Sequence, residues 1–207
     1  MPKEPCDLAH PFAVGARLVL NSGRLARVRV QRTAVLSLPT GRLVAGEFGD
    51  GVVGPAFTER VRPGDYPVVL HLADLPPHGR LPALTLVAGA RVVVREAPAT
   101  DWEMALGEGQ DPASLADDEF FAYTVRHGTG GFVDASGLPA LRQGGGPVPR
   151  PPLGALPAPV RFAAGHGNGE YPTWLGRGPD GAVVCFFTDF FVLTDGEVVE
   201  RLPEDEP

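Results

Sequence analysis

Hydrophobic and polar positions alternate along most of this chain in short runs, which is typical of half-buried β-strands. Runs at 16–20 and 25–30 flank the turn Asn21-Ser22-Gly23 and predict a hairpin. Similar runs occupy 35–38, 42–45, 65–72, 84–87, 90–95, 120–125, 160–163, 182–193 and 197–202. Turn residues separate them, because the chain contains 27 Gly and 23 Pro, about twice the usual share. The pattern predicts many strands and no long helix.

Two segments depart from the strand pattern. Residues 101–118 favour one or two short helices, since Trp102-Glu-Met-Ala-Leu106 are good helix formers and Asp111-Pro112 is a typical helix start. Residues 137–159 hold seven Pro and five Gly, which predicts a flexible insertion. We therefore expect a single domain over residues 1–207, mainly β with an α+β tendency. Its antiparallel sheets should form a sandwich or a partly open barrel.

Composition and charge limit the classes of function. The chain of 207 residues is 43% apolar, enough for one core, and it has no run of about 18 apolar residues that would cross a membrane. The N-terminus lacks the features of a secretory signal, and Cys6 and Cys185 are far apart, so a cytoplasmic protein with free thiols is expected. The net charge of −7 makes nucleic-acid binding unlikely.

The charge is also divided unevenly along the chain. Residues 1–100 carry 12 Lys and Arg against 8 Asp and Glu, whereas residues 101–207 carry 6 against 17. An acidic second half suits a basic protein partner or a divalent metal, although a solvated surface explains it equally well.

Three carboxylates stand beside apolar residues and are candidate catalytic groups: Glu103, Asp134 and Asp189. A carboxylate in such a run must face solvent, pair, or bind a ligand, because burial of a bare charge is costly. Alternation places Asp189 on one face with Phe187 and Phe191. Either it pairs with an arginine or caps backbone N–H groups, or it serves as an acid–base or metal-binding carboxylate. The common phosphate-loop, zinc and nucleophile motifs are absent from the sequence.

A glycine-rich stretch followed by aromatic residues, 165–176, is the most distinctive local feature. Three glycines alternate from Gly165 to Gly169 and permit a positive φ or a close approach, and Pro172 fixes the exit of the chain. We expect a binding site here and near residue 102. Its candidate residues are Trp102, His166, Asn168, Tyr171 and Trp174.

Taken in order, several motifs resemble an uncharacterised bacterial family, domain-of-unknown-function family 4241. They are Leu38-Pro-Thr-Gly-Arg-Leu-Val-Ala45, Pro63-Gly-Asp-Tyr-Pro-Val68, Trp102-Glu-Met-Ala-Leu106, Gly128-Thr-Gly-Gly-Phe-Val-Asp134, Gly165-His-Gly-Asn-Gly-Glu-Tyr-Pro-Thr-Trp-Leu-Gly176 and Thr188-Asp-Phe190. This chain has Gly46-Glu-Phe48 where the family typically has Cys/Asp-Asp-Pro, and Asn168 where it often has Asp. If that Asp were a metal ligand, Asn168 would weaken metal binding. The resemblance implies an organisation of the chain but no activity.

Three functions follow as hypotheses. The first is a binding or protein-interaction module, for example one that neutralises a basic partner protein through its acidic half. The second is a hydrolase that uses Glu103, Asp134 and Asp189 with or without a divalent metal. The third is a small-molecule binder whose pocket is walled by Trp102, Tyr171 and Trp174. No cofactor is implied beyond that optional metal.

Overall fold

The computed structural model describes residues 8–48, 54–143, 158–194 and 196–200. Antiparallel strands dominate these residues, which confirms the mainly β prediction. The strands are β1 (Arg17–Val19), β2 (Leu25–Leu38), β3 (Leu43–Gly46), β4 (Gly64–Leu75), β5 (Leu84–Val93), β6 (Asp101–Met104), β7 (Tyr123–Val125), β8 (Thr129–Asp134), β9 (Val160–Ala163), β10 (Gly169–Tyr171), β11 (Thr173–Arg177), β12 (Val183–Asp189) and β13 (Glu197–Glu200). The helical pieces are α1 (Leu138–Gln143) and 3₁₀ turns at Pro112–Ser114 and Ala135–Gly137.

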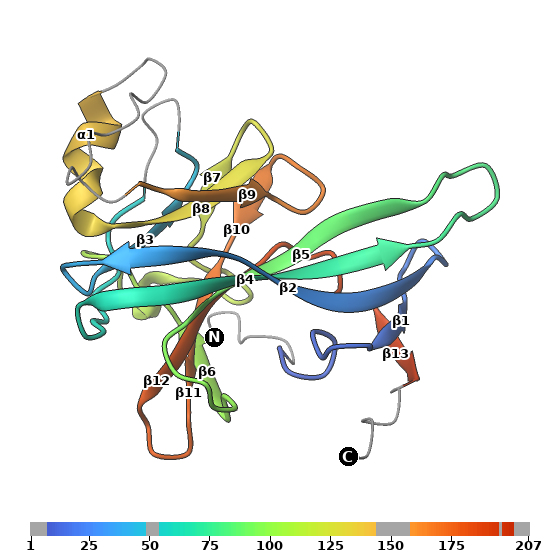
Figure 1. Cartoon of the computed structure of the whole chain (residues 1–207), viewed down its shortest axis with the longest axis horizontal. Coiled ribbons are helices and arrows are strands. Elements are labelled where there is room, and N and C mark those ends of the chain that lie inside the picture. Colours follow the sequence, from blue (N-terminus) through green and yellow to red (C-terminus); the bar gives the residue numbers. More distant parts are fainter. Residues whose placement is uncertain (1–7, 49–53, 144–157, 195, 201–207) are drawn as a thin grey trace.

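Eight of the strands form one twisted sheet in the order β13-β1-β2-β4-β5-β12-β11-β6. In Figure 1, β2, β4 and β5 run across the molecule while β12, β11 and β6 turn steeply away from them. The predicted hairpin at residues 16–30 is confirmed, because β1 pairs with β2 around Gly23. Within the described residues β13 and β6 each pair on one side only, so the sheet is not a closed barrel.

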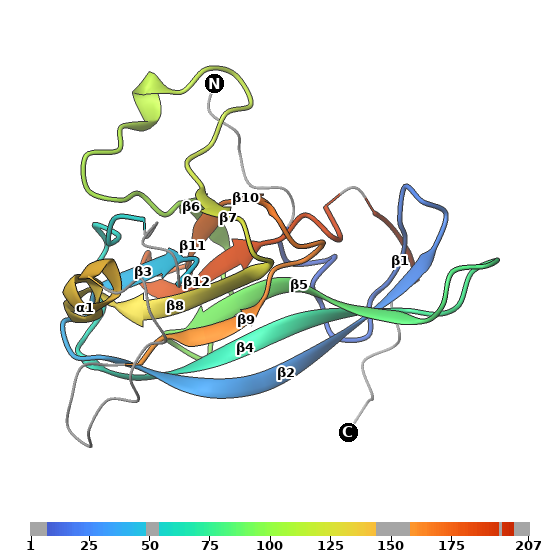
Figure 2. The same ribbon diagram turned by 90° about the horizontal axis from the view of Figure 1, so that it is seen from above.

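A three-stranded sheet, β3-β8-β9, covers one face of the large sheet at one end (Figures 1 and 2). We call the covered face the inner face; it carries Val68, Val92 and Phe186, which register places side by side. These side chains share a buried core with Phe132 of β8, and Phe57 stacks on Phe186 with ring centroids 5.8 Å apart. Burial of apolar side chains between the two sheets is therefore the main source of stability.

The opposite, outer face carries Val69, Arg91 and Phe187 in register. The segment 8–16 covers part of this face and is anchored by Phe12, whose ring contacts Phe187 at 4.8 Å between centroids. The amide of Gly15 donates to the carbonyl of Val28 at 2.8 Å, so the segment also joins the edge of the β1–β2 hairpin. Because segment 8–16 is irregular, it leaves a cavity between itself and the outer face of the sheet where side chains do not fill the space.

The structure corrects some local predictions. Residues 101–104 form the edge strand β6 rather than a helix, because they pair with β11. The second predicted helix is a single 3₁₀ turn, capped by Asp111 with Pro112 as its first residue. Of the predicted insertion, residues 138–143 form α1, and residues 144–157 lie outside the described chain.

Candidate functional site

The side chain of Asp134, a candidate catalytic residue, is held in place by hydrogen bonds within the fold. It is fully buried at the end of β8. One carboxylate oxygen accepts hydrogen bonds from the backbone N–H and the hydroxyl of Thr40, at 3.0 and 2.7 Å. The other accepts from the N–H and hydroxyl of Ser136, at 2.8 and 2.6 Å. By accepting these four hydrogen bonds, Asp134 connects the turn after β2 to the end of β8.

Asp189 is also buried, with 2% of its surface exposed, at the end of β12. Its carboxylate accepts from the Phe191 amide and the Thr194 hydroxyl, both at 2.8 Å. Phe191 has a φ of 55°, a left-handed conformation that non-glycine residues adopt rarely. The structure therefore shows the capping of a backbone N–H group that was one of the alternatives for Asp189.

Glu103 lies on the exposed side of β6, where its Oε1 accepts from Arg177 at 2.6 Å. The same guanidinium binds Glu59 at 2.7 Å. Register places Glu103 beside Leu175 and therefore on the opposite face of the sheet from Asp189. Because Asp134 belongs to the other sheet, the structure does not bring the three candidate carboxylates together.

Replacement of Glu103 by glutamine should lower the free energy of unfolding by no more than about 1 kcal/mol, the usual range for a solvent-exposed ion pair. Arg177 keeps its second carboxylate partner, Glu59, in that variant. Urea unfolding of both proteins measures the difference. A loss several times larger would mean that Glu103 supports the edge of the sheet in a way that its contacts do not show.

The predicted bend at 165–176 is a turn that leads into β10 and β11. Gly165 and Gly167 have φ values of 46° and 108°, as expected from their sequence. The Tyr171 hydroxyl donates to the Gly167 carbonyl at 3.0 Å and braces the turn from a buried position. His166 and Asn168 are exposed on it. Three of the five candidate binding residues, His166, Asn168 and Tyr171, therefore belong to one turn.

The glycine-rich turn at 165–169 lies next to the start of β8, since the Ala164 amide donates to the Gly128 carbonyl at 3.0 Å. Beside them is a residue that sequence reasoning missed. Glu47 is 8% exposed, and its carboxylate accepts from the backbone amides of Arg126 and His127 at 2.8 and 2.7 Å. It occupies the position at which the family motif was seen to differ, but nothing in its pattern predicted burial.

Trp102 and Trp174 lie on neighbouring strands of the outer face, and Trp102 borders a cavity. Trp174 is 2% exposed and is part of the core. Trp102 lies across Gly176, where an added Cβ would stand 3.0 Å from its ring. A Cβ on Gly89 would meet the Phe187 ring at 2.4 Å. The two glycines thus allow Trp102 and Phe187 to lie close to the backbone of the sheet.

The cavity lies between the outer face and segment 8–16, and we call it the N-terminal cavity. Its volume is about 470 Å³, within the usual range for small-ligand pockets. Its wall is mostly apolar, and polar side chains enter it from β2, β4 and β5. The lining residues are Leu8, Ala9, Phe12, Ala13, Val14, Val30, Arg32, Val69, His71, Arg91, Val93, Glu96, Pro98, Ala99, Trp102 and Phe187.

His71, in the middle of β4, is the most buried polar residue of this wall, with 7% exposure. Its Nδ1 lies 3.0 Å from the Phe12 carbonyl, which can only accept, so Nδ1 carries the proton and Nε2 is an acceptor. Nε2 is buried without a hydrogen-bond partner among the described residues. Burial lowers the pKa of His71 to about 4, and the charge of Arg91 acts in the same direction, although the Phe12 hydrogen bond opposes it. The imidazole is therefore neutral at pH 7.

Arg91 projects from β5 between Val69 and Phe187 on the same face. The residue is half-buried, and its Nε has no partner among the residues described. Burial raises the pKa of the nearby Cys185 thiol, which Arg91 opposes through its charge and a hydrogen bond. The two polar side chains that the structure places near Arg91, His71 and Cys185, are therefore both uncharged at pH 7.

A family model described as "Protein of unknown function (DUF4241)" matches residues 36–146, or 111 of the 207 residues. The chain belongs to this family. No curated protein and no solved structure matches it. The family match includes His71, Arg91 and Trp102, whereas the bend at 165–176 lies outside it.

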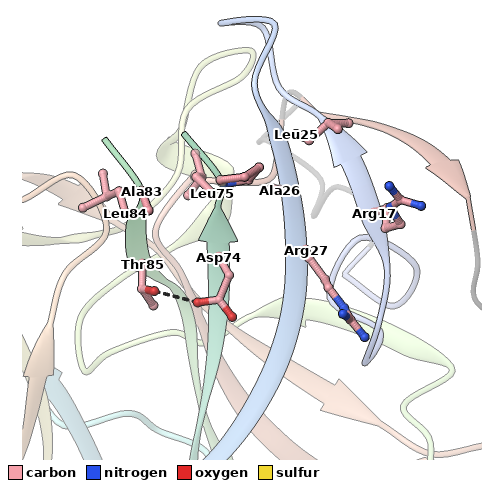
Figure 3. Close-up of a pocket in the computed structure, with 10 residues that line it drawn as sticks. Arg17, Leu25, Ala26, Arg27, Asp74, Leu75, Ala83, Leu84 and Thr85 are labelled. Carbon is pink, nitrogen blue, oxygen red and sulfur yellow. Dashed lines mark hydrogen bonds between the residues drawn. The ribbon is translucent and has the colours of Figure 1, made fainter. Parts of the chain in front are cut away.

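A second cavity of this DUF4241 member, about 690 Å³, spreads over β1, β2, β4 and β5 where they extend beyond the three-stranded sheet (Figure 3). Arg17, Arg27 and Asp74 supply its charges. Asp74 already accepts from Arg29 and Thr85, both at 2.6 Å. Leu25 and Leu84 are 41% and 44% exposed. This cavity is larger than the N-terminal cavity, but its carboxylate, Asp74, is already paired. None of the residues that line it has a buried polar side-chain atom without a hydrogen-bond partner.

The described residues contain no group of three or more His, Cys, Asp or Glu side chains placed to hold a metal ion. The buried thiol of Cys185 is free, as the sequence suggested. None of the helices in this part of the chain has the length and apolar character needed to span a membrane.

Proposed function

We propose that this protein binds a small organic molecule in the N-terminal cavity. The observation that carries the proposal is the combination found there: an aromatic wall together with two lining residues, His71 and Arg91, whose Nε2 and Nε are buried without partners among the described residues. Buried polar groups normally have hydrogen-bond partners, so an unsatisfied pair beside a cavity marks a place where a ligand would supply them.

The shape of the wall favours a flat apolar ligand. Trp102 and Phe187 meet edge to face, with ring centroids 6.1 Å apart, and Phe12 packs on Phe187 from the covering segment. Aromatic walls of this kind gain from dispersion and from apolar burial at the same time. The hydrolase hypothesis has less support, because Asp134 and Asp189 already bind neighbouring donors and Glu103 lies on another face. A basic protein partner remains a prediction from charge alone.

Filling the cavity should weaken the binding of a neutral aromatic probe, N-phenyl-1-naphthylamine. Ala13 lines the cavity from the covering segment and is exposed, so a tryptophan there can enter the cavity without disturbing the core. We expect the wild type to raise the probe's fluorescence and Ala13→Trp to weaken its binding by roughly tenfold or more.

The matched control is Ala163→Trp, which adds the same side chain at an exposed position of β9. It should bind the probe like the wild type. If Ala13→Trp and Ala163→Trp bind equally well, the probe binds elsewhere and the proposal is wrong. Absence of binding to the wild type, for this probe and for the aromatic acid and amide used below, would also refute it.

A further inference from the structure

Building on the proposed function, we infer that the ligand of the N-terminal cavity is an organic acid with one negative charge, whose acidic group pairs with Arg91 while its apolar body lies against Phe187 and Trp102. The proposed function is the binding of a small organic molecule of any charge, and the acidic group is an additional property inferred for that molecule.

Arg91 differs from the other shielded arginines of the described chain. Arg24 donates to backbone carbonyls, with distances of 3.0 Å to Pro76 and 2.9 Å to Pro82. Three partly shielded arginines bind carboxylates: Arg42 binds Glu108, Arg95 binds Asp180, and Arg177 binds Glu59 and Glu103. The Nε of Arg91 has no partner, which is also true of Arg24, Arg42 and Arg95. Among the described residues, however, Arg91 is the one of these four whose guanidinium has neither an ion pair nor a backbone carbonyl as its partner.

A shielded guanidinium without a counter-ion is unfavourable, because water is partly removed and no anion replaces it. The register of the sheet explains why the chain itself does not supply one. The cross-strand neighbours of Arg91 are Val69 and Phe187, both apolar. A ligand carboxylate can approach from the cavity side, and the planar guanidinium binds such a group with two parallel hydrogen bonds.

The remaining charges of the cavity indicate a ligand with a single negative charge. Arg32 and Glu96 stand at the exposed rim and pair with each other at 3.0 Å, so they cancel. His71 is neutral because burial lowers its pKa to about 4. Arg91 is therefore the one uncompensated charge among the residues that line this cavity. A dianion would leave one of its charges unpaired in an apolar space.

The test compares 2-naphthoate with 2-naphthamide, two probes of the same shape that differ in charge, by titration calorimetry. The wild type should bind the acid roughly tenfold or more tighter than the amide, the difference expected for a partly buried charged pair. Arg91→Met should bring the ratio to about one, because methionine keeps much of the length and loses the charge. Arg91→Lys should restore part of the preference.

Arg95→Met is the matched control, since it removes an arginine just beyond β5 that already binds Asp180. It should keep the preference of the wild type for the acid. If the wild type binds acid and amide equally, or if Arg91→Met keeps the preference, the inference is wrong while the binding proposal stands. If neither probe binds the wild type, the binding proposal itself fails. Circular dichroism confirms that each variant is folded.

Discussion

Replacement of Asp134 by alanine is expected to lower the free energy of unfolding by about 3–5 kcal/mol, a large part of the stability of a domain of this size. The carboxylate is fully buried and accepts four hydrogen bonds, two from backbone amides. Alanine leaves the amides of Thr40 and Ser136 without their acceptor in a site that water reaches poorly. Each lost acceptor costs about 1–3 kcal/mol when the donor stays buried.

Asp111 offers a matched control. It also caps a 3₁₀ turn, accepting from the Ala113 amide at 2.9 Å, but it is exposed. Asp111→Ala should therefore cost about 1 kcal/mol or less. Urea unfolding of the two variants separates burial from capping. If Asp134→Ala costs no more than Asp111→Ala, Asp134 is not a structural tie, and a catalytic role for it would regain weight.

Much of the strand pattern could be predicted from the sequence, and the failure at residues 101–104 shows why the rest could not. Trp102 and Met104 are half-buried while Asp101 and Glu103 are exposed, which is a period of two. Four residues are too few for such a period to be distinguished from a helical one. Pairing with β11, which lies about seventy residues away along the chain, decides the outcome. The secondary-structure propensities of residues 101–104 do not indicate this pairing with a distant strand.

The candidate site was missed for a related reason. Trp102 was predicted, but the other walls come from segment 8–16 and from β2, β4, β5 and β12, which only the tertiary fold brings together. A signal was nevertheless present. His71 and Arg91 each interrupt an apolar strand, as Asp189 does. The reasoning that an ionisable group in such a run needs a partner was applied to the carboxylates alone. The same argument holds for all three: Asp189 has partners within the chain, whereas His71 and Arg91 each keep one buried nitrogen without a partner among the described residues.

The pH dependence of stability should reveal that His71 is neutral in the folded protein. Its pKa is about 4 when folded, against 6.5 for an unperturbed imidazole, because burial disfavours the charged form. Between these values the unfolded chain binds a proton and the folded chain does not, so stability rises with pH across this window. Acidification from pH 7 to pH 4 should therefore remove about 3 kcal/mol through His71. Above about pH 8 neither state is protonated at this residue, and its contribution no longer changes.

The variant His71→Asn isolates this contribution. Asparagine does not titrate, and its amide N–H can replace Nδ1–H as the donor to the Phe12 carbonyl. Carboxyl groups also titrate near the acidic end of the range, but they are common to both proteins and cancel in the difference. The wild type should lose about 3 kcal/mol more than His71→Asn between pH 7 and pH 4, as measured by urea unfolding at each pH. His78→Asn, at an exposed position, is the control substitution.

Equal losses in the wild type and His71→Asn would mean that His71 takes up its proton while the protein is folded. The imidazolium would then need water or an anion beside it. Since Arg91 already lies near and opposes that charge, the N-terminal cavity would have to be open to solvent at His71. An imidazole that is shielded from water and an imidazole that takes up its proton near pH 6.5 in the folded protein cannot both hold. Stability measurements without any ligand thus test the premise on which the binding proposal depends.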